Sequence, residues 1–253
     1  MRILLLLSAV LMPLVAWLSG TGAFGPDNGT ISDRYPTLLV AAGYAFSIWG
    51  LVFLLDLAFG AWQVRAKQDS AGKLERIRPV AAAGFVLTAA WMPIFSEELF
   101  WLALLVIWAS LGCLLYCAIV LARGLRANDG ASPWAWIPLS LHAGWLSLAA
   151  FLNTAQVIVA YELLPTDDML PWSAALFAAA AALLLAANWR MRGNWVFLAA
   201  VAWGLAAVYV KQSSSPLPGA HAAAWIAVGV AAVLAAQTLW LRLGRPATRG
   251  QRG

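Results

Sequence analysis

Charged residues are scarce in this sequence, and they gather in short segments between long apolar runs. Asp, Glu, Lys and Arg make up 11% of the chain and hydrophobic residues 63%, whereas a soluble domain is about half apolar. No polar stretch is long enough to form a second, soluble domain. The apolar runs reach about 20 residues, the length a helix needs to cross the hydrocarbon core. Their Ala- and Leu-rich composition, as in residues 174–187, favours helices over the weak period-two pattern of a membrane barrel.

Cysteine and histidine are also scarce, with two residues of each. Cys113 and Cys117 lie four residues apart in one apolar run, which is typical of small buried side chains rather than of a metal site. The sequence contains no nucleophile elbow, P-loop, dinucleotide fingerprint or H-E-x-x-H. These absences do not favour an enzyme, and we predict no catalytic residue, no metal and no required cofactor.

The formal net charge of +5 does not indicate a nucleic-acid partner, because the basic residues lie at the ends of predicted helices and form no stripe. Lys and Arg accumulate on the cytoplasmic side of membrane proteins. With the N-terminus inside, all but two of the 16 basic residues, Arg34 and Lys211, fall in cytoplasmic segments. We therefore expect an all-α integral membrane protein with both termini in the cytoplasm, placed in a bacterial inner membrane. The eight predicted spans are residues 3–20, 37–64, 79–96, 98–122, 134–161, 171–189, 194–211 and 221–242.

The first span has an alternative interpretation. Arg2, an apolar core and the small residues Thr21-Gly22-Ala23 also fit a cleaved secretory signal. The loop that follows lies outside in either case, so the charge pattern does not decide between them.

The 15 tryptophans fall into two groups. Most mark the ends of spans, as expected of aromatic belts at the headgroup level. The deeper ones predict either helix packing or the wall of a ligand site; they are Trp49, Trp91, Trp108, Trp145 and Trp203.

Two ionisable residues, Asp56 and His142, lie within predicted spans, where such groups are costly and often functional. Both lie roughly 12–14 Å from the cytoplasmic ends of their helices, at 1.5 Å per residue. Equal depth is what a hydrogen-bonded pair requires. The pair predicts either a structural hydrogen bond or a proton relay.

Helical spacing places further residues on the helix faces that carry Asp56 and His142. In the second span the stripe consists of Phe46, Trp49, Phe53 and Asp56. In the fifth span it consists of His142, Trp145, Ala149, Asn153 and Gln156. A mixture of aromatic surface and a few polar groups suits a pocket for a flat, largely apolar ligand. The alternative is a helix–helix seam in which polar groups join the spans.

Three segments together resemble the TspO/MBR family of tryptophan-rich sensory proteins, whose mitochondrial members are called translocator protein or peripheral benzodiazepine receptor. They are residues 42–53 (AGYAFSIWGLVF), 91–95 (WMPIF) and 145–153 (WLSLAAFLN). The likeness covers about residues 1–160. It implies a five-helix bundle over residues 1–162, a three-helix transmembrane extension over 163–243 and a basic cytoplasmic tail over 244–253.

The resemblance implies a pocket for porphyrins, haem-like tetrapyrroles, sterols or synthetic aromatic ligands, with helices two and five as neighbours. The residues it places in or beside the pocket are Trp49, Phe53, Trp91, Phe95, Trp145 and Asn153, to which the stripe adds Phe46. The sequence departs from the family pattern at Asp56, at Thr88 and at Leu141-His142. These departures lie on the presumed ligand side.

These features leave several functions open. The first is a membrane receptor or carrier for a flat lipophile such as a tetrapyrrole or a sterol-like molecule, with a sensory or transport role. The second is a proton-coupled transporter of another small molecule that uses Asp56 and His142. The third is a membrane enzyme or the subunit of a larger membrane assembly. The expected partners are the bilayer, a small lipophilic ligand and either a second copy or another membrane protein.

Overall fold

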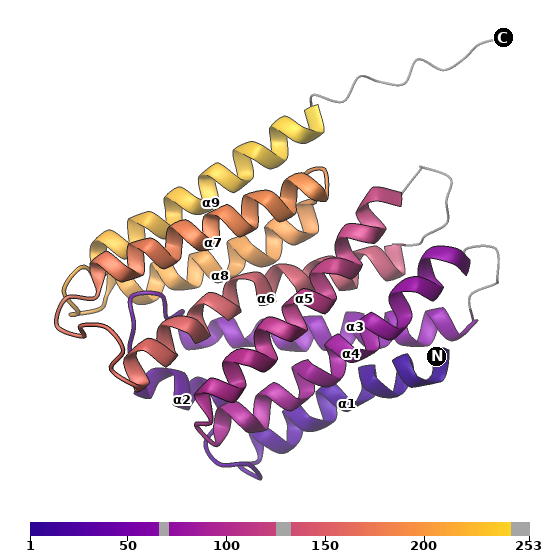
Figure 1. The fold of residues 1–253 in the computed structure, drawn as a ribbon, viewed down its shortest axis with the longest axis horizontal. Helices are drawn as coiled ribbons and strands as arrows, with labels where there is room; N and C mark the ends of the chain where they lie inside the picture. Colours follow the sequence, from indigo (N-terminus) through magenta and orange to yellow (C-terminus); the bar gives the residue numbers. More distant parts are fainter. Residues whose placement is uncertain (66–70, 125–132, 244–253) are drawn as a thin grey trace.

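The computed structural model describes residues 1–65, 71–124 and 133–243, and these residues form nine α-helices and no strand (Figure 1). Eight of the helices are long and apolar enough to cross a membrane, which confirms the all-α, eight-span prediction. The predicted tail over 244–253 lies outside the described residues. The long helices are α1 (Arg2–Gly20), α3 (Ile48–Arg65), α4 (Ala71–Ser96), α5 (Phe100–Gly124), α6 (Pro133–Ala160), α7 (Leu170–Arg190), α8 (Trp195–Ser213) and α9 (Ala220–Leu243).

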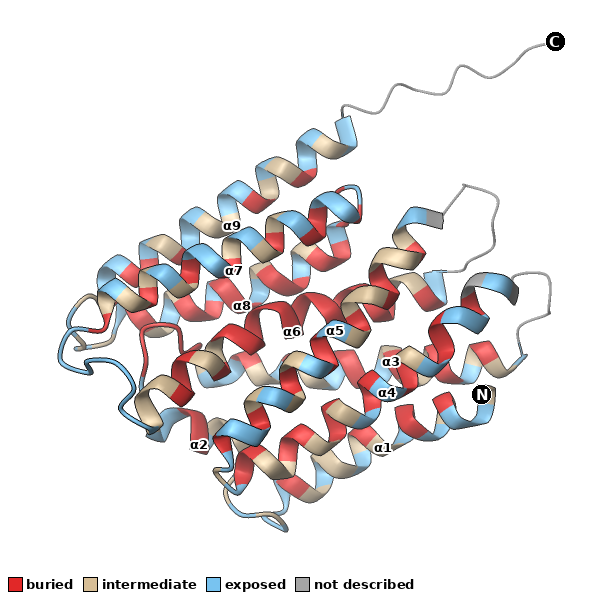
Figure 2. Ribbon diagram, in the orientation of Figure 1, coloured by how far each residue is buried: buried red, intermediate tan, exposed pale blue. Residues whose placement is uncertain are grey.

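Helix α6 is the centre of the molecule. It has the largest buried share of the eight spans (Figure 2). Helices α3 and α5 pack against it on one side, with α1 and α4 beyond them, and α7 and α8 pack against it on the other, with α9 outside. The predicted contact between helices two and five is therefore present, as α3 against α6.

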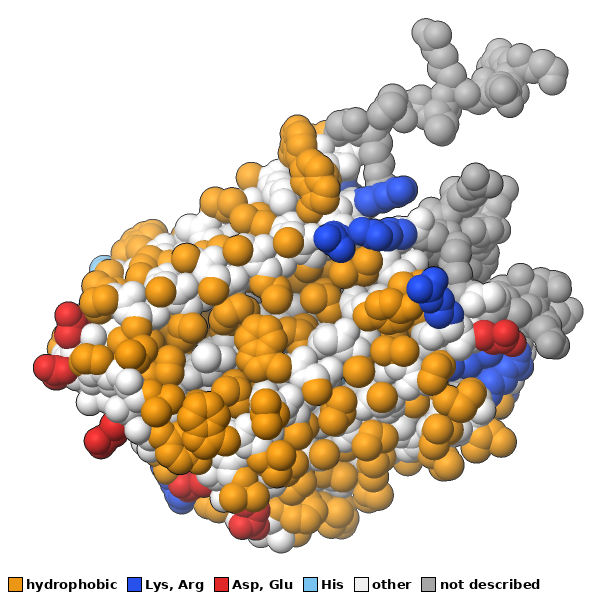
Figure 3. Space-filling model, in the orientation of Figure 1, with side chains coloured by type: hydrophobic (Ala, Val, Ile, Leu, Met, Phe, Trp, Pro, Cys, Tyr) orange, Lys and Arg blue, Asp and Glu red, His pale blue; other side chains and the backbone are white. Residues whose placement is uncertain are grey.

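The N-terminus and the end of α9 lie at the same end of the bundle, as an even number of spans requires (Figure 1). Lys and Arg side chains gather at that end and Asp and Glu side chains at the opposite end (Figure 3). Because basic residues accumulate on the cytoplasmic side, the end with the two termini is the cytoplasmic one. We call the opposite end the outer end.

Helix α1 is an integral part of the bundle. Its side chains of Leu5, Ala9 and Met12 are fully buried, and it packs against α3 and α4. A Cβ added to Gly60 on α3 would lie 3.3 Å from the Cβ of Ala9, so the two helices approach closely. This packing is what we expect of a retained span, because removing α1 would expose the buried faces of α3 and α4.

The prediction of a helix over residues 37–64 is wrong at its beginning. A short helix α2 (Asn28–Arg34) lies before it, residues 37–42 are not helical, and a 3₁₀ turn η1 (Gly43–Ser47) leads into α3. The backbone of residues 37–42 finds its partners elsewhere: Gln212 of α8 donates to the carbonyls of Thr37 and Val40, and the Ala42 N–H donates to Ala207 O. We call residues 37–42 the α8-bound segment.

The third predicted span, 79–96, begins too late. Helix α4 starts at Ala71 and passes through Pro79. Its first two turns carry charged residues that a hydropathy argument excludes, and the apolar span itself runs over Leu74–Ser96. Residues 71–73 extend the helix beyond this span toward the cytoplasm.

Candidate functional site

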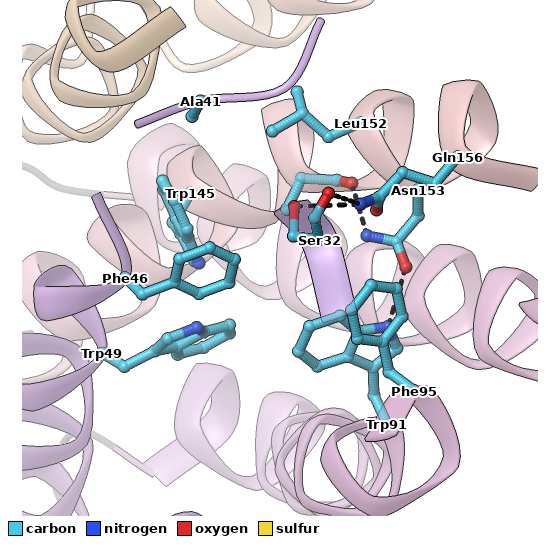
Figure 4. Close-up of a pocket in the computed structure, with 11 residues that line it drawn as sticks. Ser32, Ala41, Phe46, Trp49, Trp91, Phe95, Trp145, Leu152, Asn153 and Gln156 are labelled. Atoms are coloured by element: carbon cyan, nitrogen blue, oxygen red, sulfur yellow. Dashed lines mark hydrogen bonds between the residues drawn. The ribbon is translucent and has the colours of Figure 1, made fainter. Parts of the chain in front are cut away.

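Five aromatic side chains line a small buried cavity in the outer half of the bundle (Figure 4). They come from four elements of the fold: Phe46 from η1, Trp49 from α3, Trp91 and Phe95 from α4, and Trp145 from α6. The rings touch one another at angles that favour aromatic pairs. Trp49 meets the edge of Trp145 with ring centroids 6.0 Å apart, and Trp91 stacks on Phe95 at 4.9 Å.

The wall that faces Phe46, Trp49 and Trp145 carries polar groups beside Trp91 and Phe95 (Figure 4). Asn153 Oδ1 accepts a hydrogen bond from Trp91 Nε1 at 2.9 Å, and Gln156 Nε2 donates to Ser32 Oγ at 2.9 Å. Asn153 also donates from Nδ2 to Ala149 O, which fixes the orientation of its amide. The buried Nε1–H of Trp145 has no hydrogen-bond partner within the described residues. The cavity therefore holds one unsatisfied donor beside oriented amides, and a ligand oxygen or nitrogen could accept from it.

A second cavity adjoins the first toward the outer end and shares Phe46, Trp49 and Trp91 with it. It lies between the end of α1, the start of α2, α3 and α4, and Phe53 belongs to its wall. Its volume is about 220 Å³ and that of the first is about 20 Å³. Pockets for drug-sized ligands measure about 300–1,000 Å³. A large flat ligand therefore fits only when the shared side chains move and the two cavities merge.

Helix α2 borders the outer side of this second cavity and is fixed by polar contacts. Asp27 caps it by accepting from the backbone N–H groups of Gly29 and Thr30, at 2.9 and 3.1 Å. The hydroxyl of Thr30 also donates to Asp27, and these hydrogen bonds hold the pKa of the Asp27 carboxyl below its usual value. At the other end of α2, Arg34 forms an ion pair with Glu98 at 2.9 Å.

Tyr35, which follows α2, donates its hydroxyl to the same Glu98, and this hydrogen bond raises the pKa of the Tyr35 phenol. Glu98 begins the turn into α5 with a positive φ of 57°. The contact therefore joins the end of α2 to the α4–α5 turn. Together with the Asp27 cap it holds α2 in place over the second cavity.

Asp56 and His142 form a hydrogen bond in the bundle interior. Asp56 Oδ2 lies 2.7 Å from His142 Nδ1, and both side chains are fully buried. The other ring nitrogen of His142, Nε2, lies 3.3 Å from Thr88 Oγ1, which in turn lies 2.8 Å from Ser110 Oγ. Ser110 Oγ donates to the carbonyl of Gly84. The buried cluster thus joins α3, α6, α4 and α5, and we call these four side chains the Asp56–Ser110 cluster.

Proton counting assigns the donors in this cluster. Ser110 has one hydroxyl proton, which goes to Gly84 O, so its oxygen accepts from Thr88. The single hydroxyl proton of Thr88 is therefore donated to Ser110, so the oxygen of Thr88 accepts from His142 Nε2–H. One proton therefore remains between Asp56 and Nδ1 of His142, as a neutral acid–imidazole pair or as an ion pair. In this arrangement the chain ends at a backbone carbonyl and does not conduct a proton toward α5.

The Asp56–Ser110 cluster lies directly behind the aromatic wall. The rings of Trp49 and His142 form an edge-to-face pair with centroids 5.7 Å apart, and the ring of Phe85 stacks on His142 at 5.9 Å. The carboxylate–imidazole–hydroxyl order is also that of a nucleophilic triad. Thr88 and His142 line neither of the two aromatic cavities, so those cavities give no substrate access to the hydroxyl.

The structure therefore brings the predicted site residues into two neighbouring groups. Phe46, Trp49, Trp91, Phe95, Trp145 and Asn153 line the first cavity and Phe53 the second, where it stacks on Trp49 at 5.2 Å. Asp56 and His142 lie in the cluster behind them. Thr88, noted in the sequence as a departure from the family pattern, is the residue that joins this pair to α4. All three departures from the pattern thus meet in one hydrogen-bonded cluster.

Three residues that line the first cavity were not predicted from the sequence: Ser32, Ala41 and Leu152. Ser32 lies in α2 and Ala41 in the α8-bound segment, and neither segment has a periodicity that places its side chains. Leu152 is an ordinary apolar residue of α6 and carries no distinguishing signal.

The deeper tryptophans divide between the two predicted roles. Trp49, Trp91 and Trp145 line the aromatic cavity. Trp108 and Trp203 join helices, because Trp108 Nε1 donates to Thr154 of α6 and Trp203 Nε1 of α8 donates to Ala45 O of η1.

These features define an integral, multi-pass helical membrane protein with an aromatic-walled interior cavity. A family model described as TSPO-like protein matches residues 2–240, and the chain belongs to that family. The match includes the last three helices, whereas the motif resemblance covers about residues 1–160. No curated protein and no solved structure gives a significant match. The division into a five-helix bundle and a three-helix extension stays a prediction.

Proposed function

We propose that this protein is a membrane receptor or carrier for a flat lipophilic molecule, such as a tetrapyrrole or a sterol-like compound, with a sensory or transport role in a bacterial inner membrane. The observation that carries the proposal is the convergence of five aromatic side chains on one buried cavity with an amide-bearing wall. Flat apolar faces stack on such rings, and a few polar groups fix the orientation of the ligand. Membership of the TSPO-like family supports the same class of function.

The cavity geometry adds one requirement for the ligand. It needs a hydrogen-bond acceptor that reaches the unpaired Nε1–H of Trp145. Porphyrins carry carboxylates and sterols a hydroxyl, so both classes meet this requirement. The two cavities are small as they stand, and we expect Trp49 and Phe46 to move when a ligand of this size binds.

Tryptophan fluorescence tests the proposal. The purified chain should show saturable quenching when it is titrated with a porphyrin such as protoporphyrin IX, together with a shift of the porphyrin absorption band. Trp145→Ala should weaken the apparent affinity by about tenfold or more, because it removes an aromatic wall and a buried donor.

The matched control is Trp225→Ala on α9, which also removes an indole but from an exposed position away from the cavity. Its apparent affinity should equal that of the original chain. Linear, non-saturable quenching, or equal loss in both variants, would reject the proposal.

The Asp56–Ser110 cluster favours a second candidate, a proton-coupled transporter of a small molecule. The proton shared by Asp56 and His142 lies next to Trp49 of the cavity, so protonation and ligand occupancy could be linked. In proteoliposomes this role predicts pH-dependent uptake that Asp56→Asn abolishes while the protein still elutes as a folded species. Unchanged uptake in that variant would exclude the role.

A membrane enzyme or a subunit that binds a second copy or another membrane protein is the third possibility. Mild detergent extraction followed by mass determination distinguishes it, since a stable partner co-purifies with the chain.

A further inference from the structure

Two adjoining clefts lie at the cytoplasmic end of the bundle, far from the aromatic cavity. The first, of about 600 Å³, lies between α4, α5 and α7, and the second, of about 550 Å³, continues it toward α9. Both are lined by Arg123 at the end of α5 and by Arg190 at the end of α7. The first also includes Arg76 of α4 and the second Arg192. We call them together the arginine cleft.

The arginine cleft is positively charged and contains no carboxylate among its described lining residues. Arg123 and Arg190 form no ion pair or hydrogen bond within the part of the chain that the structure describes. The ion pairs Arg34–Glu98 and Lys211–Asp33 both lie at the outer end. The guanidinium groups of Arg123 and Arg190 are thus available to an external anion.

One arginine of the cleft is held in place. Arg76 Nε donates to the hydroxyl of Tyr116 at 2.7 Å, and its guanidinium lies over the Tyr116 ring, 5.8 Å from the centroid. This leaves the other guanidinium nitrogens of Arg76 to bind a ligand in a defined direction. An arginine fixed in this way loses less conformational entropy on binding.

The lining of the cleft is amphipathic in the manner of a lipid site. Tyr116, Ile119 and Val120 of α5 provide an aromatic and apolar wall beside the arginines. At the far side, the exposed rings of Trp189 and Trp240 pair with centroids 5.5 Å apart. Exposed tryptophans of this kind mark the headgroup level of a bilayer. The arginines therefore lie where lipid phosphates lie, next to apolar surface that suits the start of an acyl chain.

We infer that the arginine cleft binds the phosphate headgroup of an anionic phospholipid of the cytoplasmic leaflet. Guanidinium groups recognise phosphate oxygens through paired, charge-assisted hydrogen bonds. Basic pockets between transmembrane helices on this side bind such headgroups. The general excess of positive charge inside explains why arginines lie at this end, but not why α4, α5 and α7 direct theirs to one cleft.

Lipid titration of the purified, delipidated full-length chain tests the inference. Phosphatidylglycerol and phosphatidylcholine with identical acyl chains are added in detergent, and bound lipid is counted by native mass spectrometry. Phosphatidylglycerol should bind more tightly than phosphatidylcholine. Arg123→Gln and Arg190→Gln should each weaken its binding by about fivefold, as expected for one basic residue at the membrane surface.

The matched control is Arg65→Gln, which removes an exposed arginine at the same end but from α3, outside the cleft. Its affinity for phosphatidylglycerol should stay unchanged. An equal loss in Arg65→Gln, or equal binding of the two lipids, would overturn the inference. Displacement of the lipid by millimolar inorganic phosphate would also overturn it, because the site would then be one for free phosphate.

Discussion

The carboxylate of Asp56 has one hydrogen-bond partner within the described structure, His142, and the carboxylate of Asp33 likewise has one, Lys211. The nitrogen–oxygen distance is 2.7 Å in both pairs, yet the side chains of the first pair are fully buried and those of the second are about half exposed. Removing one partner of a buried pair leaves an uncompensated polar group and costs about 3–5 kcal/mol, whereas an exposed pair is worth about 0–1 kcal/mol. Burial rather than distance should therefore decide how much stability is lost when one partner is removed.

We therefore predict that Asp56→Ala lowers the free energy of unfolding in mild detergent by about 3–5 kcal/mol. Asp33→Ala, the matched control, should change it by less than about 1 kcal/mol. The double variant Asp56→Leu/His142→Phe should be less destabilised than Asp56→Ala, since it leaves no unpaired polar group. Similar losses for Asp56→Ala and Asp33→Ala would contradict the burial argument.

The cap of α2 should depend on pH in one direction. Because Asp27 accepts three hydrogen bonds, its pKa is lower in the folded protein than in the unfolded chain. The cap is therefore fully present above about pH 4 and is lost as the pH falls through the lower, folded-state pKa.

Hydrogen exchange of α2 measures this effect. Exchange in residues 28–34 should rise in Asp27→Ala at neutral pH, since loss of a cap costs about 1 kcal/mol. Asp27→Asn keeps an acceptor and should behave like the original chain at neutral pH. If Asp27→Ala leaves the exchange of these residues unchanged, the cap does not hold α2.

Helices α6 and α8 cross at Gly144. A Cβ added there would lie 2.8 Å from the backbone oxygen of Phe197 and 2.9 Å from the Cβ of Ala200, and neither atom can move without moving α8. Small residues at such crossings let membrane helices approach closely. The close approach brings α8 against the helix that carries Trp145.

Gly144→Ala should therefore destabilise the protein by about 1–3 kcal/mol, the usual cost of overpacking. Gly229 on α9 has open space around it, so Gly229→Ala should be neutral or stabilise by up to about 1 kcal/mol. Thermal unfolding in detergent compares the two. Equal melting temperatures for both variants would show that α6 and α8 are not in this contact.

The sequence and the structure agree on the number of spans and differ on where the second and third spans begin. The bilayer sets the length of the apolar runs and the placement of the basic residues, so the number and direction of the spans could be predicted from them. The depth of Asp56 and His142 follows from helix geometry, and their contact could be anticipated. The path of residues 37–42 could not, because its hydrogen bonds go to Gln212 and Ala207, far away in the sequence. Ala41 belongs to this segment, so its place in the cavity wall could not be predicted either.

For the whole molecule, the cavity is built by more than the first five spans. Helix α8 holds the α8-bound segment through hydrogen bonds of Gln212 and Ala207, and it packs against α6. Its Lys211 also forms an ion pair with Asp33 of α2. A chain that ends at residue 162 lacks these contacts. We predict that it binds porphyrin at least tenfold more weakly than the full chain, even where it inserts into the membrane. Quenching titrations of both chains in the same detergent make the comparison, and equal affinities would support an independent five-helix unit.

The α8-bound segment also provides a mechanical link. Ala41 is part of the cavity wall, while its neighbour Ala42 donates to Ala207 of α8. A ligand that displaces Ala41 would also displace Ala42 and so act on α8, and the packing of α8 against α9 would carry this displacement to α9. Cavity occupancy thereby becomes readable on the far side of the protein, for example by a fluorescent probe placed on α9.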